Sequence, residues 1–304
     1  MNSSVNRGLH RFTVFTTACT FLLLVAGALV TSNDAGLAVP DWPLSYGSLM
    51  PPMVGGIFYE HGHRVLATFV GFLTILLALW LWRCEPRPGV KRLGLLALGA
   101  VVAQGVLGGL TVRFYLPVAI SVAHATLAQI FFGTVSSLAL FTSAWWQQDL
   151  PRLEDSGTPR ICTLARWSVA AIFLQLILGA VFRHRGFGIA PHLVGASVVV
   201  VLVFWLARAL GRRYPMVPVL RRGSLLLQVL LGAQLLFGGA AWWSRALARE
   251  FPQPIAVTVW LTVVHTVTGA VVLAAAIGVL LVCYRILGAE RQGVFRSPPV
   301  RATS

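Results

Sequence analysis

Four histidines are the residues that could do chemistry, because each lies near the start of a long apolar run: His63, His124, His192 and His265. An ionisable side chain inside an apolar segment is costly and by default marks a functional site. Zinc usually takes three or four protein ligands, and copper or di-iron sites need more ligands than one histidine pair supplies. A haem needs only one or two axial ligands, and neutral imidazole suits it. The pattern predicts two haem pockets, His63 with His124 and His192 with His265. Any one of these histidines could instead serve a helix–helix hydrogen bond or a proton relay.

Only the first of these histidines has a carboxylate beside it, in "FYEHGHRVLA" (58–67). If the helix begins slightly before the apolar run, Glu60 and His63 are three residues apart and share a face. Glu60 could then pass protons at the edge of an apolar cavity. The alternative is a carboxylate at a helix N-terminus, stabilised by the helix dipole. The two pockets are therefore expected to differ, one being reactive and the other holding a resident cofactor.

The remaining three histidines have simpler explanations. His10 lies in the N-terminal tail. His61 and His184 fall in expected loops, where a solvated or structural role is predicted for each.

Long apolar runs must position these side chains. The chain has 304 residues, 57% of them hydrophobic and 11% charged, with a mean hydropathy of +0.79. A soluble domain needs more polar surface than this. The runs are about as long as a ~30 Å hydrocarbon core requires, and they must be helical because lipid leaves no partner for unpaired backbone groups. They do not alternate polar with apolar residues, which excludes a β-barrel. The eight runs are Phe12–Thr31, His63–Trp82, Leu93–Val112, Val118–Phe141, Ala165–Phe182, Pro191–Leu210, Leu225–Trp243 and Ile255–Tyr284. The first is read as a retained helix and not a signal peptide.

The runs repeat in pairs. "QGVLGG" (104–109), "QLILGA" (175–180) and "QLLFGG" (234–239) each precede a helix that carries one of the four histidines, although the first run lacks this motif. Close packing of small residues, with Gln bonding between helices, would also explain these motifs. A polar stretch at 146–160 divides the chain. The predicted fold is an all-α integral membrane protein whose eight transmembrane helices form two pseudo-symmetric four-helix bundles. Residues 1–150 form the N-terminal half and 151–304 the C-terminal half.

The net charge of +15 follows membrane topology and does not indicate nucleic acid. With the N-terminus inside, only six of the 24 basic residues lie outside, which fits the positive-inside rule. We therefore expect a multi-pass protein of a bacterial-type plasma membrane, in contact with membrane lipid, with both termini cytoplasmic. The outer arginines could anchor at the interface or pair with haem propionates; they are Arg64, Arg113, Arg183, Arg185, Arg245 and Arg249. None of the four cysteines lies in the large outer loops, so no structural disulfide is predicted.

"GLAVPDWPLSYG" (36–47), followed by E-x-x-H-R (60–64) and three later helix-borne histidines, resembles the haem A synthase family over about residues 10–285. The resemblance implies oxidation of the C8 methyl group of haem O to a formyl group, which yields haem A for terminal oxidases. It implies that Glu60 is the catalytic acid and that His63 and His124 flank the substrate haem. His192 and His265 would be the axial ligands of a haem b cofactor, and iron would be the metal in both halves. A haem O synthase is the natural supplier of the substrate, and the oligomeric state stays open.

The chain departs from the family pattern in one respect. Many bacterial members carry a cysteine pair in the first outer loop, where this chain has Val39 and Ser45. A loop disulfide therefore has no role here.

Two other functions compete with this expectation. A membrane electron-transfer cytochrome with two b-type haems would use the same four histidines but would need neither Glu60 nor the DWP loop. A transporter with paired halves is the third reading, although its site would be expected at the membrane midplane.

Overall fold

The computed structural model describes residues 6–155, 157–248, 250–252 and 254–288. Arg249, the basic residues of 289–304 and the predicted position of the C-terminus lie outside the described residues. The described chain contains eight helices that are long and apolar enough to cross a membrane. They are α1 (Arg7–Ser32), α2 (Gly55–Cys84), α3 (Pro88–Arg113), α4 (Val118–Thr142), α6 (Ile161–Arg183), α7 (Ala190–Arg213), α8 (Pro218–Leu247) and α9 (Ala256–Ile286). The prediction of an all-α integral membrane protein with eight spans is confirmed.

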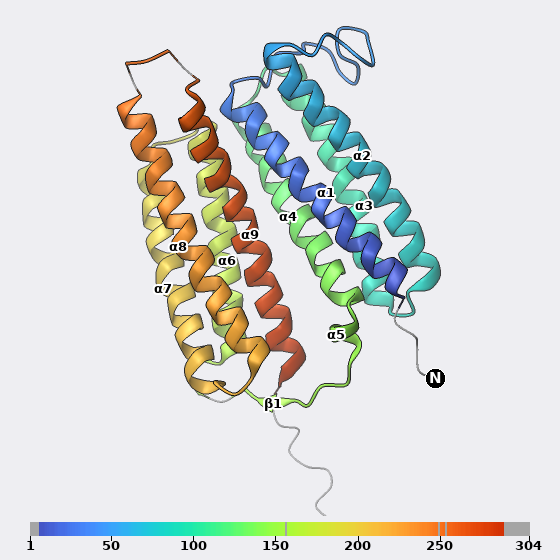
Figure 1. Cartoon of the computed structure of the whole chain (residues 1–304), viewed down its shortest axis with the longest axis vertical. Helices are drawn as coiled ribbons and strands as arrows, with labels where there is room; N and C mark the ends of the chain where they lie inside the picture. Colours follow the sequence, from blue (N-terminus) through green and yellow to red (C-terminus); the bar gives the residue numbers. More distant parts are fainter. Residues whose placement is uncertain (1–5, 156, 249, 253, 289–304) are drawn as a thin grey trace, which may run out of the picture.

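The helices form two side-by-side groups of four (Figure 1). In one group, α1 packs on α2 and α4, and α3 packs on α2 and α4. In the other group, α6 packs on α7 and α9, and α8 packs on α7 and α9. Each group therefore closes a ring of four neighbours around its own core, as a four-helix bundle does.

Helix α9 joins the two bundles. It packs against α1 and α4 as well as against its own neighbours. Ala270 of α9 is fully buried in the core of the N-terminal bundle. A methyl group on Gly133 of α4 would stand 2.9 Å from Ile277 Cδ1 of α9. Small residues let these two helices approach closely, as is typical of membrane helix packing.

The polar linker between the halves has some regular structure. It contains α5 (Ala144–Gln147), and β1 (Leu153–Glu154) pairs in parallel with β2 (Leu287–Gly288) at the end of α9. This two-residue pairing was not predicted, because neither segment has a strand-like pattern. The pairing ties the linker to the last helix of the C-terminal bundle.

The largest difference from the sequence expectation is the start of α2. The apolar run indicates a start at His63, but the helix begins at Gly55. The preceding loop packs on this extension: a methyl group on Gly56 would stand 2.8 Å from the Ala38 Cβ. Because the loop covers it, the extension remains ordered beyond the apolar run, and Glu60 and His61 lie inside the helix.

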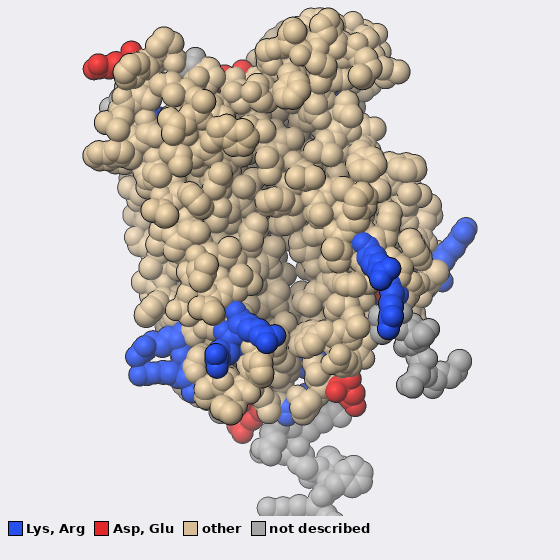
Figure 2. All heavy atoms as spheres, in the orientation of Figure 1, with Lys and Arg blue, Asp and Glu red and all other residues tan. Residues whose placement is uncertain are grey.

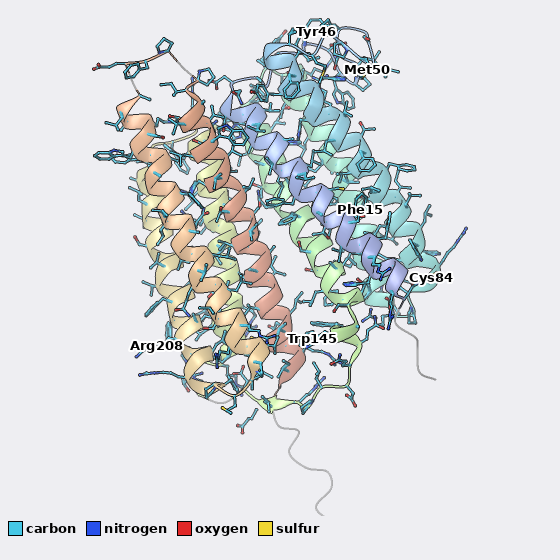
Figure 3. All side chains as sticks on the ribbon, in the orientation of Figure 1. Phe15, Tyr46, Met50, Cys84, Trp145 and Arg208 are labelled. Atoms are coloured by element: carbon cyan, nitrogen blue, oxygen red, sulfur yellow. The ribbon has the colours of Figure 1, made fainter. Side chains whose placement is uncertain are left out.

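The two ends of the molecule differ in charge. Figure 2 shows the Lys and Arg side chains of the visible face gathered toward the lower end, where α1 begins. The loop of residues 33–54, with Tyr46 and Met50, lies at the opposite end from Cys84 and Arg208 (Figure 3). We call the end that carries residues 33–54 the loop end.

Candidate functional site

Each of the four predicted histidines rests its imidazole against a glycine of the preceding helix. A methyl group on that glycine would stand between 2.8 and 3.4 Å from the histidine Cε1. Such contacts are closer than the 3.5–4.0 Å optimum for two carbon atoms. The pairs are Gly27 with His63 (3.2 Å), Gly108 with His124 (3.4 Å), Gly179 with His192 (3.0 Å) and Gly238 with His265 (2.8 Å).

This contact extends the repeat to the first helix. In α3, α6 and α8 the glycine follows the motif glutamine by four residues. The equivalent segment of α1 is "LLVAGA" (23–28), in which Gly27 is retained and Leu23 replaces the glutamine. The first run lacks the motif only when the glutamine is used as its marker. The glycine four residues later was the signal that could have shown the fourth copy.

In the C-terminal bundle, His192 and His265 face each other. Their ring centroids are 6.3 Å apart and their planes are nearly perpendicular, at 86°. His265 Nδ1 lies 3.2 Å from the Gln234 carbonyl oxygen. Because a carbonyl can only accept, this contact makes Nδ1 the donor and leaves the Nε2 lone pair free. The Gln175 amide lies 3.0 Å from His192 Nδ1 and donates to the His192 carbonyl at 2.8 Å.

This geometry fits two axial ligands of one metal. A metal–imidazole bond of about 2.0 Å on each side, plus about 1.1 Å from nitrogen to ring centre, sets two axial rings about 6.2 Å apart. The observed separation of 6.3 Å agrees. The described residues hold no cluster of three or more His, Cys, Asp or Glu suited to a metal ion. A group that brings its own equatorial ligands, as a haem does, is therefore the kind of cofactor this pair fits.

The N-terminal pair is similar but less constrained. His63 and His124 lie close enough for their charges to interact. His63 Nδ1 is buried and has no hydrogen-bond partner among the residues that the structure describes, whereas His124 interacts with the Gln104 backbone. In the C-terminal bundle, by contrast, both histidine Nδ1 atoms have a partner. The two pairs thus share one scaffold but differ in how firmly each imidazole is held.

Glu60 is buried with a full set of partners, and only 4% of its surface is exposed. Its Oε2 accepts from the Val39 backbone N–H at 2.8 Å, and its Oε1 forms an ion pair with Arg64 at 2.6 Å. It is the sixth residue of α2, and the first turn of that helix contains no acidic residue. The alternative of a carboxylate at the helix N-terminus is therefore wrong.

The Arg64 side chain forms most of its hydrogen bonds with the loop. Its guanidinium donates to the carbonyls of Asp41 (2.7 Å), Leu44 (2.8 Å) and Val39 (3.2 Å), in addition to Glu60. These bonds use both terminal nitrogens of Arg64, and its pairing with a propionate stays a prediction. Arg64 and Glu60 together fasten residues 39–44 over the start of α2.

The loop closes on itself through Asp41. The carboxylate accepts from the backbone N–H groups of Tyr46 (2.7 Å) and Gly47 (2.8 Å), while the Tyr46 hydroxyl donates to the Ala38 carbonyl. The Gly47 N–H, helped by the Tyr46 N–H and by Arg64, holds the pKa of Asp41 below its usual range. Trp42 extends the loop to α3, since a methyl group on Gly109 would stand 2.8 Å from its ring.

His61 differs from its expected place in a solvated loop. It lies within α2, only 5% of its surface is exposed, and its Nδ1 is 2.8 Å from Ser45 Oγ. The structural role predicted as the other option is the one observed. Val39 and Ser45, where the family pattern led us to expect a cysteine pair, are both buried. Hydrogen bonds and packing hold this loop, and all four cysteines of this chain are unpaired.

The bundles also meet at the loop end through Arg183. This side chain at the end of α6 donates to the Thr31 carbonyl (2.7 Å) and lies 3.3 Å from Ser32 Oγ at the end of α1. His184, the next residue, is half-buried, and burial followed by the charge of Arg183 lowers its pKa. Of the outer arginines, Arg183 therefore joins helices and does not simply anchor at the interface.

Fold and site together define a multi-pass membrane protein with two histidine pairs on a repeated His–Gly scaffold. A family model described as "Cytochrome oxidase assembly protein" matches residues 53–191, which include Glu60, His63 and His124. A heme A synthase of Symbiobacterium thermophilum is 29% identical over 265 residues, covering 76% of this chain and 85% of the relative. Heme A synthases of Shouchella clausii and Lysinibacillus sphaericus are 30% and 31% identical, each covering 59% of this chain and 60% and 59% of the relative. The chain is thus similar to proteins named heme A synthase over most of its length.

Proposed function

We propose that this protein is a haem A synthase that oxidises the C8 methyl group of haem O to a formyl group. One observation carries the proposal: two histidine pairs share one scaffold, and only one of them has a buried carboxylate one helical turn away. A protein that only passed electrons between two haems would have no need of this asymmetry. The similarity to proteins named heme A synthase supports the same reaction.

In this proposal His192 and His265 hold a resident haem b, which supplies one-electron redox chemistry when bound. Their ring separation supports the assignment. The Gln234 carbonyl orients His265 for ligation, as outer-shell hydrogen bonds do at metal sites. The C-terminal half, residues 151–304, is thus the cofactor half.

The N-terminal half, residues 1–150, receives the haem O substrate between His63 and His124. Glu60 is the catalytic acid–base group, because it is buried and shares α2 with His63 at a spacing of three residues. In the described chain its carboxylate is paired with Arg64. A proton held on Glu60 is therefore exchanged next to a fixed positive charge.

The protein is also proposed to lie with its loop end outside and its N-terminus in the cytoplasm. The basic side chains gathered at the end where α1 begins support this orientation through the positive-inside rule. Haem O is strongly apolar, so a haem O synthase in the same membrane is the natural source of the substrate.

The experiment is co-expression with a haem O synthase in a host that lacks haem A, followed by extraction and mass identification of the haems. The wild-type chain is expected to yield a haem that carries a formyl group. Glu60→Gln is expected to lose at least 100-fold of this product while haem b stays bound, since general acid–base groups contribute about 10²–10⁴-fold. Glu85→Gln is the matched control, because Glu85 is an equally buried carboxylate, paired with Arg87, just past the opposite end of α2.

The electron-transfer cytochrome remains the second candidate, because the four histidines suit it equally. It predicts that the wild-type chain binds haem but leaves haem O unconverted. It also predicts that Glu60→Gln and Glu85→Gln behave alike.

A further inference from the structure

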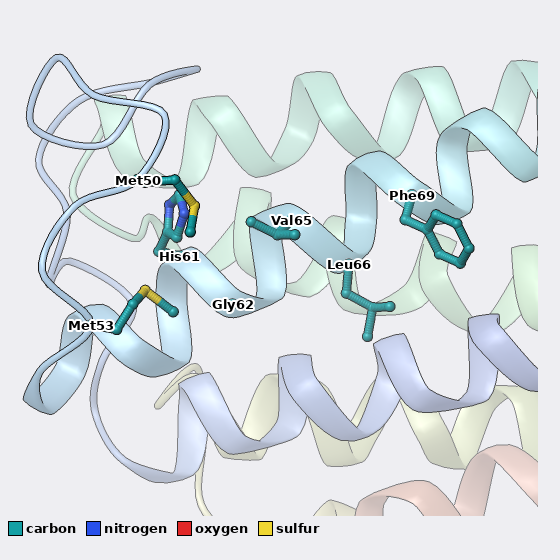
Figure 4. Close-up of a pocket in the computed structure, with 7 residues that line it drawn as sticks. All are labelled: Met50, Met53, His61, Gly62, Val65, Leu66 and Phe69. Atoms are coloured by element: carbon teal, nitrogen blue, oxygen red, sulfur yellow. The ribbon is translucent and has the colours of Figure 1, made fainter.

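A cavity of about 420 Å³ lies on the outside of the N-terminal bundle, beneath the loop. Figure 4 shows the His61 side chain between Met50 and Met53 of the loop, with Val65, Leu66 and Phe69 following along α2. The volume lies in the range of about 300–1,000 Å³ that small-molecule sites occupy. The walls are almost entirely apolar, so the one imidazole is their main polar feature.

One ring nitrogen of the His61 imidazole has no described hydrogen-bond partner. Nδ1 of His61 is engaged by Ser45, but Nε2 is buried and has no hydrogen-bond partner in the described part of the chain. A buried polar group without a partner costs roughly 1–3 kcal/mol, so its presence calls for an explanation. A ligand that reached Nε2 from the cavity, by shifting the side chains that cover this atom, would remove this cost.

The cavity opens toward lipid. Val65 and Phe69 are 51% and 44% exposed, and the apolar exposed surface continues down the same helix through Phe72, Leu76 and Leu79. Such a stripe on a membrane helix contacts hydrocarbon. A ligand that entered here would come from the bilayer, with a polar head at His61 and an apolar chain along α2.

The cavity is also adjacent to the proposed reactive site without being part of it. His61 and His63 are two residues apart, which separates them by about 3 Å along the helix and about 200° around it. His63 points to Gly27 inside the bundle, whereas His61 lines the outer cavity. A redox-active ligand at His61 would therefore lie about one helix diameter, roughly 10 Å, from a group at His63.

We propose that this cavity binds the head group of a prenylated quinone, with a carbonyl oxygen of the quinone bonded to Nε2 of His61. The pair Ser45–His61 suits both oxidation states. When the Ser45 hydroxyl donates to Nδ1, Nε2–H donates to a quinone carbonyl; in the other tautomer Nε2 accepts from a quinol hydroxyl. The Met50 and Met53 thioethers supply soft contacts to the ring. A bare hydrocarbon tail, such as that of haem O, would leave Nε2 unpaired.

The role of the quinone rests on the proposed function. Oxidation of a methyl to a formyl group with water as the oxygen source releases four electrons and four protons: R–CH3 + H2O gives R–CHO + 4 H+ + 4 e−. Two quinones take up these electrons and protons and leave as two quinols, which balances the reaction. The quinone is thus the electron acceptor of the enzyme.

Binding is tested by photolabelling the full-length protein in lipid nanodiscs with an azido-substituted short-chain ubiquinone and mapping the label by mass spectrometry. The label is expected on residues 50–69. Val65→Trp, which fills the cavity one helical turn from His61, is expected to reduce labelling at least tenfold and to leave the haem content unchanged. Leu79→Trp is the matched control, because Leu79 is similarly exposed, at 55%, on the same helix outside the cavity.

Three results would overturn the proposal. The first is labelling that Val65→Trp leaves unchanged, and the second is an equal loss in Leu79→Trp, which would indicate general partition into lipid. The third is a label displaced by haem O but not by excess unlabelled quinone, which would assign the cavity to the prenyl tail of the substrate. Labelling requires no turnover, so the test of quinone binding remains valid even if no formyl haem forms. Where haem A does form, two quinols are expected per haem A, and their absence would refute the acceptor role alone.

Discussion

Replacement of Gly238 by alanine tests the His–Gly scaffold most directly. The new methyl group would stand 2.8 Å from Cε1 and 3.1 Å from Nδ1 of His265. Two carbons need about 3.5 Å, so the imidazole must move by roughly 0.7 Å. Metal–ligand distances tolerate only about 0.2 Å. The substitution is therefore expected to disturb ligation by His265 more than it disturbs the helix.

The energies support this expectation. Overpacking costs about 1–3 kcal/mol, whereas alanine is favoured over glycine in a helix by about 1 kcal/mol, so the net change in folding free energy is small. Disturbance of the groups around a metal ligand typically lowers affinity 10–100-fold. The purified variant should retain its helix content by circular dichroism and lose most of its haem b, measured as the pyridine haemochrome.

Neighbouring glycines provide the control and the refutation. A methyl group on Gly239 meets nothing within 4 Å, so Gly239→Ala should keep its haem. Within the C-terminal pair, Gly179→Ala should have a milder effect than Gly238→Ala, because its methyl would stand 3.0 Å from His192 Cε1. Equal haem loss in Gly238→Ala and Gly239→Ala, or full haem retention in Gly238→Ala, would refute the reasoning.

Three further predictions concern the loop and the contact between bundles. Arg64→Met leaves Glu60 buried without its charged partner and should lower the free energy of unfolding by about 3–5 kcal/mol. The measurement is a lower Tm in detergent, and an unchanged Tm would show that stability does not depend on this ion pair. The lowered pKa of Asp41 stabilises the folded loop above the ordinary value of about 3.9 and loses this effect as the pH falls through the lowered value. Hydrogen exchange in residues 41–47 should therefore be protected at pH 5–8 and lose protection below about pH 4, and Asp41→Asn should remove this transition. Arg183→Met should speed exchange at the end of α1 without affecting the loop; slowed or unchanged exchange there would count against the link between bundles.

The spans were predictable because lipid enforces them. A backbone that cannot bond to water must form continuous helices, so eight apolar runs were enough to find eight spans. The short pairing of β1 with β2 was not predictable, since it depends on two segments more than 130 residues apart that meet only after the bundles form. Hydropathy predicts which segments lie in lipid, but it does not predict a contact between two distant polar segments.

The start of α2 and the partners of Arg64 could not be read from the sequence for a related reason. The apolar run begins at His63, whereas the helix begins eight residues earlier, at Gly55. The earlier start is possible because a Gly- and Pro-rich loop packs over this part of the helix. The count of basic residues predicts the side of the membrane on which Arg64 lies. It does not predict whether its partner is a loop carbonyl or a propionate. Partners of this kind are set by the folded loop, whose conformation no periodicity encodes.

The difference between the bundles follows from few substitutions in a repeated unit. Where three copies have glutamine, the first has Leu23, which packs against the N-terminal core and has no side-chain hydrogen bond to give. His63 has an Nδ1 without a described partner, whereas His265 Nδ1 donates to the Gln234 backbone carbonyl and His192 Nδ1 lies 3.0 Å from the Gln175 amide nitrogen. A firmly oriented imidazole pair suits a cofactor that stays, and a less constrained pair suits a substrate that must enter and leave. Among the described residues, Glu60 and the loop lie only beside the less constrained pair, so only this pair has a buried carboxylate one helical turn away.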